Sequence, residues 1–164
     1  MNAVVRGLIF SGDHLLVTGW RDGSVVFPIG GRVEFGEPLL ESLRREVQEE
    51  TGVEVTASRL LYFAENLFTT EKGVQFHEYG WYFWVETGRP VCALDETIPN
   101  PDHPDLVIWY LPLDKINSVT FWPLFLPRYL PSDQADGFAG NPRYIYCRQD
   151  RAGETRVQEL GWFV

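Results

Sequence analysis

The chain has 164 residues, of which 45% are hydrophobic and 15% aromatic, and its formal net charge is −9. This length and apolar fraction predict a single folded domain, 1–164, and exclude a disordered chain. The negative charge argues against binding to duplex nucleic acid or to an anionic membrane, and no apolar stretch is long enough to span a bilayer. Two widely separated cysteines, Cys92 and Cys147, are typical of a reduced cytoplasmic protein.

The first part of the chain predicts three short strands. Residues 3–10 and 14–20 are rich in β-branched and apolar side chains and are separated by Ser-Gly-Asp, which indicates a hairpin. Residues 25–27 form a third apolar run, which ends at Pro28 because proline cannot continue a central strand.

Residues 38–51 form the clearest predicted helix. Pro38 suits a first turn, where its missing N–H costs nothing, and Gly52 suits the left-handed residue that ends a helix. At about 100° per residue one stripe of this helix is apolar, and we expect that stripe to be buried. Its members are Leu39, Leu43 and Val47, with Leu40 close by.

The remainder of the chain predicts mostly strands. We expect strands or strand fragments at 54–56, 59–63, 73–86 and 106–111, with a long loop at 87–104. A turn or short helix should begin at residue 112, and at most a short helix should form within 121–130. The C-terminal extension, 132–164, should end in a hairpin around 150–153. One firm helix among many strands indicates a mixed α/β domain.

Three glutamates of the predicted helix lie on one sector. Glu46, Glu49 and Glu50 are three and four residues apart, so their like charges repel, and they lie in the C-terminal half, where the helix dipole disfavours anions. Runs of this kind often form a solvated face. The alternative is a bound divalent cation, because Mg²⁺ takes carboxylate and phosphate oxygens as ligands.

The residues around these glutamates favour the cation. Gly31, Glu37 and the segment Arg45-Glu-Val-Gln-Glu-Glu-Thr-Gly-Val53 match every defined position of the Nudix box. The chain therefore resembles the Nudix hydrolase family. The resemblance implies an α/β/α sandwich with a mixed sheet and a loop–helix–loop motif, and hydrolysis of a phosphoanhydride bond in a small nucleotide substrate with Mg²⁺, or with Mn²⁺ in its place.

The resemblance also implies roles for individual residues. Glu46, Glu49 and Glu50 would be the metal ligands, together with the Gly31 carbonyl. Arg45 would orient the carboxylates, and Glu37 would fix the loop. Residues expected to contact substrate are Gly30, Gly31, Arg32 and Phe27.

Outside the box the sequence leaves alternatives open. Many family members have Leu-Pro-Gly-Gly before the helix, whereas this chain has Phe-Pro-Ile-Gly-Gly at 27–31. A carboxylate after the box can supply a general base, and Glu78, beside His77, is the first candidate and Glu65 the second; each could equally be an ordinary strand residue. Candidates for stacking on a base, all of which could instead be core residues, are Phe27, Trp20, Trp81 and Phe121.

The sequence hypothesis is a magnesium-dependent pyrophosphohydrolase in which Glu46 or Glu78 acts as base. Nucleoside tri- or diphosphates are favoured as substrates, and nucleotide sugars, ADP-ribose and dinucleoside polyphosphates are the other candidates. The rival is a Nudix-fold sensor that binds a nucleotide without cleaving it and regulates a partner protein. The intact box and the acidic charge favour the enzyme, and a homodimer is left open.

Overall fold

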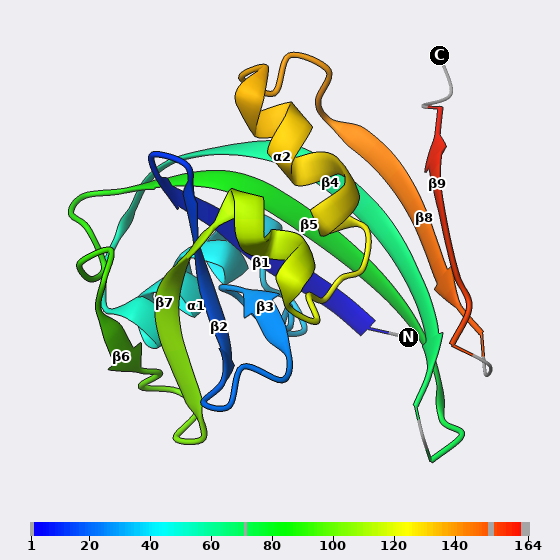
Figure 1. Ribbon diagram of the computed structural model, residues 1–164, viewed down its shortest axis with the longest axis horizontal. Coiled ribbons are helices and arrows are strands. Elements are labelled where there is room, and N and C mark those ends of the chain that lie inside the picture. Colours follow the sequence, from blue (N-terminus) through cyan, green and yellow to red (C-terminus); the bar gives the residue numbers. More distant parts are fainter. Residues whose placement is uncertain (1, 71, 151–152, 162–164) are drawn as a thin grey trace.

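A mixed β-sheet forms the centre of the computed structural model, which describes residues 2–70, 72–150 and 153–161 (Figure 1). Within these residues the sheet has nine strands, in the order β6-β7-β2-β1-β5-β4-β8-β9, with β3 paired to β2. The pairs β1–β5 and β4–β8 are parallel and the others antiparallel. The strands are β1 (Asn2–Ser11), β2 (His14–Trp20), β3 (Val26–Pro28), β4 (Val55–Thr69), β5 (Gln75–Thr87), β6 (Thr97–Pro99), β7 (Leu106–Pro112), β8 (Arg143–Gln149) and β9 (Thr155–Leu160).

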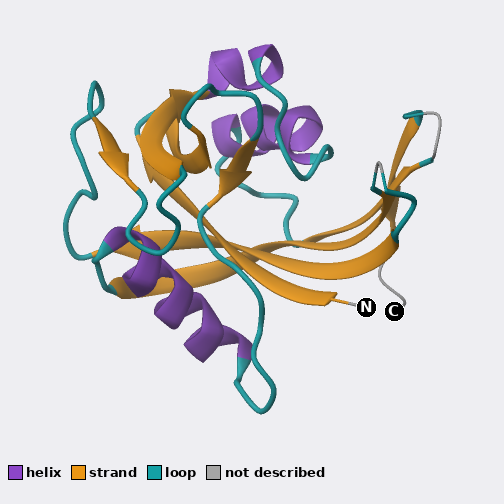
Figure 2. Cartoon of the chain, turned by 90° about the horizontal axis from the view of Figure 1, so that it is seen from below, coloured by secondary structure: helices purple, strands orange, loops and turns teal. Residues whose placement is uncertain are grey.

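Helices cover both faces of the sheet. The helix α1 (Leu39–Thr51) lies on one face, and α2 (Leu126–Ala135) with the 3₁₀ helix η1 (Leu113–Ser118) lies on the other (Figure 2). Each layer has its own apolar core. Leu43 and Val47 of α1 pack with Val5 and Phe83 on the first face. Leu126 and Leu130 of α2 pack in the core on the second face of the sheet. The expected α/β/α sandwich is therefore confirmed.

The bounds of α1 follow from its sequence as predicted. Pro38 is the N-cap, and Gly52 is the C-cap with φ 69°, its N–H donating to the Gln48 carbonyl at 2.9 Å. The predicted buried stripe is only partly right, because Leu40 is 45% exposed. Gly7 of β1 lets the helix approach the sheet, since a Cβ there would lie 3.3 Å from the Val47 side chain.

Four other segments differ in extent from their predictions. The fragments at 54–56 and 59–63 belong to one long strand, β4, and the predicted loop 87–104 contains the short strand β6. The helix near 121–130 instead runs from Leu126 to Ala135 and includes Pro131, because its apolar face is buried. The terminal hairpin forms from β8 and β9, while residues 151–152 of its predicted turn and residues 162–164 lie outside the described residues.

Candidate active site

The loop between β3 and α1 runs alongside β1. The strands β1 and β2 pair only at their hairpin end, and beyond it the loop takes the place of β2 as the neighbour of β1. Gly7 N–H donates to the Ile29 carbonyl at 2.8 Å, and Val5 N–H to the Gly31 carbonyl at 2.9 Å. Gly30 has φ 125°, and a Cβ there would collide with the Val5 carbonyl, so only glycine fits this close approach.

Arg45 gathers the carboxylates of the box. Its guanidinium donates to both oxygens of Glu37 at 2.9 and 3.0 Å, and its Nη1 donates to Glu46 at 2.8 Å and to Glu49 at 2.9 Å. It also donates to the Arg32 carbonyl at 3.1 Å, while the Arg32 side chain is exposed. Hydrogen bonding to Arg45 lowers the pKa of Glu37 to about 2. Arg45 thus orients the carboxylates and ties the loop to the helix.

Glu50 is held in a different way. Its Oε2 accepts from Gly30 N–H at 2.6 Å, and its Oε1 accepts from the Asn100 amide at 3.0 Å. Asn100 is 2% exposed; its amide also donates to the Thr18 hydroxyl, and its Oδ1 accepts from the N–H groups of Asp102 and His103. The loop after β6 therefore fixes the orientation of this carboxylate.

Burial raises the pKa of Glu46 and of Glu50 above the ordinary value of 4.5. For Glu46 the opposing influence is the Arg45 guanidinium, and for Glu50 it is the Gly30 N–H and the Asn100 amide. For both carboxyls the effect of burial on the pKa exceeds the effect of the protein's own hydrogen bonds and positive charges. Carboxyls that bind a metal ion are expected to behave in this way when the ion is absent.

The three glutamates of α1 that are predicted to bind metal offer the oxygen ligands that a hard cation takes, but their carboxylates do not point toward one common position. Within the described ranges, no group of three or more His, Cys, Asp or Glu side chains is arranged to hold a metal ion. Glu46 and Glu49 are both bonded to Nη1 of Arg45, whereas Glu50 is bonded to Gly30 and Asn100. The Glu46 carboxylate rests directly against Gly31, where a Cβ would lie 2.7 Å from Oε1. This contact places the Glu46 carboxylate, an oxygen donor of the kind that Mg²⁺ takes, directly against the backbone of the loop.

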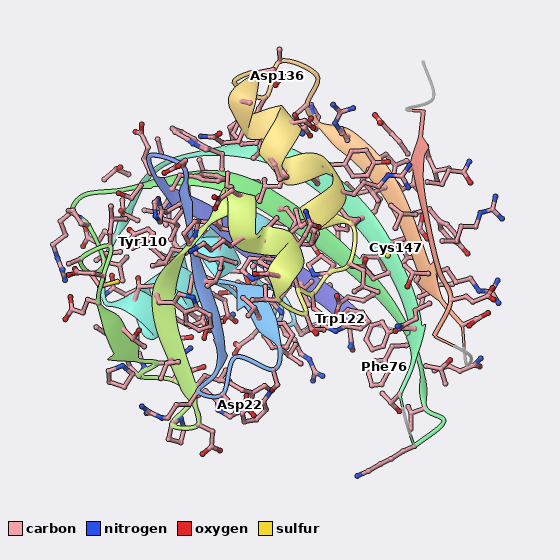
Figure 3. All side chains as sticks on the ribbon, in the orientation of Figure 1. Asp22, Phe76, Tyr110, Trp122, Asp136 and Cys147 are labelled. Carbon is pink, nitrogen blue, oxygen red and sulfur yellow. The ribbon has the colours of Figure 1, made fainter. Side chains whose placement is uncertain are left out.

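The loop between β3 and α1 contains Gly30 and Gly31 and is called the glycine loop. A cavity of about 240 Å³ adjoins this loop on the α2 face of the sheet. It is lined by Arg6, Val25, Phe27, Asn66, Phe68, Glu78, Tyr82, Trp122 and Pro123. Phe68 stacks on Phe76 at 5.1 Å between ring centroids and contacts Trp122 at 5.5 Å; both of these partners are labelled in Figure 3. Aromatic rings with a few polar groups are suited to a planar heterocycle.

Of the four residues predicted as candidates for stacking on a base, one lines this cavity and three lie elsewhere. Phe27 lines the cavity. Phe121 is 1% exposed and belongs to the core, and Trp20 is 41% exposed and packs edge-on against His103. Trp81 packs on Phe63 on the other face of the sheet. The residues that the sequence did not single out are Phe68 and Trp122.

His77 and Glu78, adjacent in sequence, have different surroundings. Glu78 lines the cavity, and burial raises its pKa. His77 bonds Glu65 at 2.9 Å, and Glu65 also accepts from Tyr144. Successive residues of a strand point to opposite faces of the sheet, so His77 and Glu65 lie on the face away from the cavity.

Arg6 connects the two parts of the site. Its Nη1 donates to the Pro28 carbonyl at 3.2 Å and also to the Gly30 carbonyl, and its side chain lines the cavity. Its positive charge acts on the carboxyls of Glu46, Glu50 and Glu78. Sequence reasoning missed both Arg6 and Asn100. A lone arginine inside an apolar strand was the available signal for Arg6, whereas Asn100 lies in a polar loop and gave none.

The comparisons with known proteins agree with this architecture. The sequence model of the NUDIX domain matches residues 2–131. Among solved structures, the chain is similar to the "mMutator MutT protein" from Bacillus halodurans, with a TM-score of 0.72 and 16% identity over 96% of this chain and 97% of that one. It is also similar to a NUDIX hydrolase from Nitrosomonas europaea, with a TM-score of 0.57 and 20% identity over 83% of this chain and 89% of that one. A third similar structure is a UDP-X diphosphatase, with a TM-score of 0.56 and 19% identity over 87% of this chain and 66% of that one.

The matching family model covers most of the chain and includes the box. The chain belongs to the Nudix domain family, and it is a hydrolase of that family. Enzymes of this family act on phosphoanhydride bonds of small nucleotides with the help of divalent metal ions. Across the described residues, no helix combines the length and apolar character needed to cross a bilayer.

Proposed function

We propose that this protein is a Mg²⁺-dependent pyrophosphohydrolase that cleaves a nucleoside diphosphate linked to another group. Nucleoside tri- and diphosphates are the favoured substrates, ahead of nucleotide sugars, ADP-ribose and dinucleoside polyphosphates. One observation carries the proposal: the carboxylates of α1 and the aromatic cavity adjoin the same glycine loop, with Arg6 between them. A base in the cavity would direct its phosphates toward that loop.

In this proposal Glu46, Glu49, Glu50 and the Gly31 carbonyl hold Mg²⁺, and Mn²⁺ can replace it. The bound cation polarises the phosphoryl group and lowers the pKa of water. The Gly31 carbonyl already accepts one hydrogen bond, from Val5, and has a second lone pair available. Arg45 keeps Glu37 as a bidentate partner, so it stays anchored when the other carboxylates turn toward the cation.

The remaining residues bind and orient the substrate. The backbone of Gly30 contacts the phosphates, and Arg6 adds a positive charge beside it. Phe27 contacts the base, and the exposed Arg32 side chain contacts phosphate. Glu46 accepts the proton of the attacking water, because its carboxylate adjoins Gly31, whereas Glu78 lies among the aromatic walls of the cavity.

The test is a product-resolved assay over a nucleotide panel with Mg²⁺. Separation of phosphate, pyrophosphate and nucleoside monophosphate shows which phosphorus is attacked. We expect turnover by the wild type and none by the variant carrying both Glu49→Gln and Glu50→Gln, with that variant still folded by circular dichroism. Measurable nucleotide binding without turnover in the wild type would reject the enzyme and favour the sensor.

A further inference from the structure

Glu78 is an acid with spare hydrogen-bonding capacity on the wall of an aromatic cavity. Its Oε1 accepts one long hydrogen bond from the Asn66 amide, at 3.5 Å. No described residue donates to its Oε2. Transfer of a carboxyl out of water without full replacement of its hydrogen bonds is unfavourable, and burial accordingly raises its pKa. A ligand that donates hydrogen bonds would satisfy this group.

The other polar groups of the cavity are largely committed to protein partners. Arg6 donates to the carbonyls of the loop, at the side of the cavity nearest the α1 carboxylates. The Asn66 amide donates to the Tyr82 hydroxyl at 3.2 Å, while Asn66 Oδ1 is buried without a hydrogen-bond partner in the described chain. Away from Arg6, Glu78 Oε2 and Asn66 Oδ1 are therefore acceptors without a donor among the described residues, while the Tyr82 hydroxyl and the Trp122 indole N–H are the donors of the cavity wall.

The volume of the cavity limits what can enter. At about 240 Å³ it is smaller than the ~300–1,000 Å³ of sites that take a whole drug-sized ligand. It is suited to one planar ring system, with the rest of the ligand extending past Arg6 toward the glycine loop. Phe27, Phe68 and Trp122 supply apolar faces for such a ring.

We propose that Glu78 selects the nucleobase, and that it accepts hydrogen bonds from an edge with two adjacent N–H donors, the pattern of guanine N1–H and its exocyclic amine. This inference rests on the proposed function of the site. Adenine and cytosine present a ring-nitrogen acceptor beside their amine, which would face the carboxylate with a lone pair, and uracil has a single N–H between two carbonyls. A site built to bond a donor rejects ligands that lack it.

The first test compares bases in the wild-type protein. We expect kcat/KM for a guanosine nucleotide to exceed that for the inosine nucleotide, which lacks only the exocyclic amine, by about tenfold, and that for the adenosine nucleotide by more. Calorimetric affinities of GDP, IDP and ADP should have the same order, and this measurement needs no turnover. Equal affinities for the three would overturn the inference without any variant.

The second test uses Glu78→Gln, which replaces one acceptor by a donor in the same shape. It should lower kcat/KM and affinity for guanosine nucleotides by about tenfold or more and leave those for adenosine nucleotides unchanged or raised. Glu86→Gln, an exposed carboxyl later in the same strand, is the matched control with the same change of charge and should leave the base preference intact.

The outcomes separate this inference from the proposed function. If Glu78→Gln lowers kcat by one factor for every base and leaves affinities unaltered, Glu78 is a general base and the inference is wrong. An equal loss for all bases with a lowered Tm would give it a structural role, which also overturns the inference. If the wild type binds GDP selectively through Glu78 and hydrolyses no nucleotide, the inference stands and the proposed hydrolysis fails.

Discussion

Alanine substitutions at the two adjacent glycines of the loop should affect different properties, catalytic activity at Gly31 and stability at Gly30. At Gly31 the new Cβ would lie 2.7 Å from Oε1 and 2.6 Å from Cδ of Glu46, where ordinary contacts begin at 3.4 Å. Because Oε2 of Glu46 would lie nearer still, the carboxylate must move by about 1 Å, which disturbs its bond with Arg45. A displacement of this size in a catalytic group can lower turnover about 100-fold. Because the displaced atoms end a flexible side chain, we expect the stability to change by less than about 1 kcal/mol.

At Gly30 the obstacle is backbone. Alanine would occupy φ 125° and place its Cβ against the Val5 carbonyl, which cannot rotate away. A strained backbone of this kind costs about 1–3 kcal/mol, and the collision adds to it. For a chain of this length about 3 kcal/mol corresponds to a decrease in Tm of about 6–12 °C.

The assay measures Tm by circular dichroism and kcat at saturating substrate and Mg²⁺ for the wild type and both variants. We expect Gly31→Ala to lose activity with a nearly unchanged Tm, and Gly30→Ala to lose Tm. If Gly31→Ala retains full turnover, the position of the Glu46 carboxylate beside Gly31 does not matter for catalysis and the reasoning is refuted.

Three further predictions concern Asn100, the buried glutamates and the cavity wall. Asn100→Ala removes the amide that fixes Glu50, so it should destabilise the protein by about 2–4 kcal/mol and lower kcat; an unaltered urea midpoint would contradict this. In EDTA, the raised pKa values of Glu46 and Glu50 mean that the folded state binds more protons than the unfolded state from pH 4.5 upward, so stability falls as the pH rises through the folded pKa values. Thermal unfolding should therefore give a Tm that decreases as the pH is raised above about 4.5, and a Tm that increases over that range would reject the assignment. Phe68→Ala should raise KM at least about fivefold with little change in kcat, because stacking contributes about 1–3 kcal/mol per base; an unchanged KM would exclude this ring from the base site.

Local patterns in the sequence were sufficient to predict α1 and the residues of the box. Pro38 and Gly52 set its ends through their own backbone preferences, and the spacing of its glutamates fixes them on one side of any helix. The burial of Leu43 and Val47 follows from the same periodicity. What could not be predicted locally is which partner holds each carboxylate, since Asn100 reaches Glu50 from a loop far along the chain.

The cavity was harder to predict because its lining comes from several strands and loops. Trp122 precedes α2 and Phe68 belongs to β4, so the contact between their rings joins segments that are far apart in the sequence. One signal was nevertheless present in the sequence: adjacent residues of a strand alternate between faces, so His77 and Glu78 could not both line one pocket. The extent of α2 was underestimated because prolines count against a helix, whereas burial of Leu126 and Leu130 outweighs that preference here.

Calorimetric titration of Mg²⁺ into the metal-free protein, with a non-hydrolysable nucleoside diphosphate analogue present, tests the central claim most directly. If the carboxylates of α1 hold the cation against the diphosphate, the wild type should bind Mg²⁺ and Glu49→Gln should bind it at least about tenfold more weakly, because one charged oxygen ligand has been removed. Equal affinities for the two proteins, with both folded, would contradict the account.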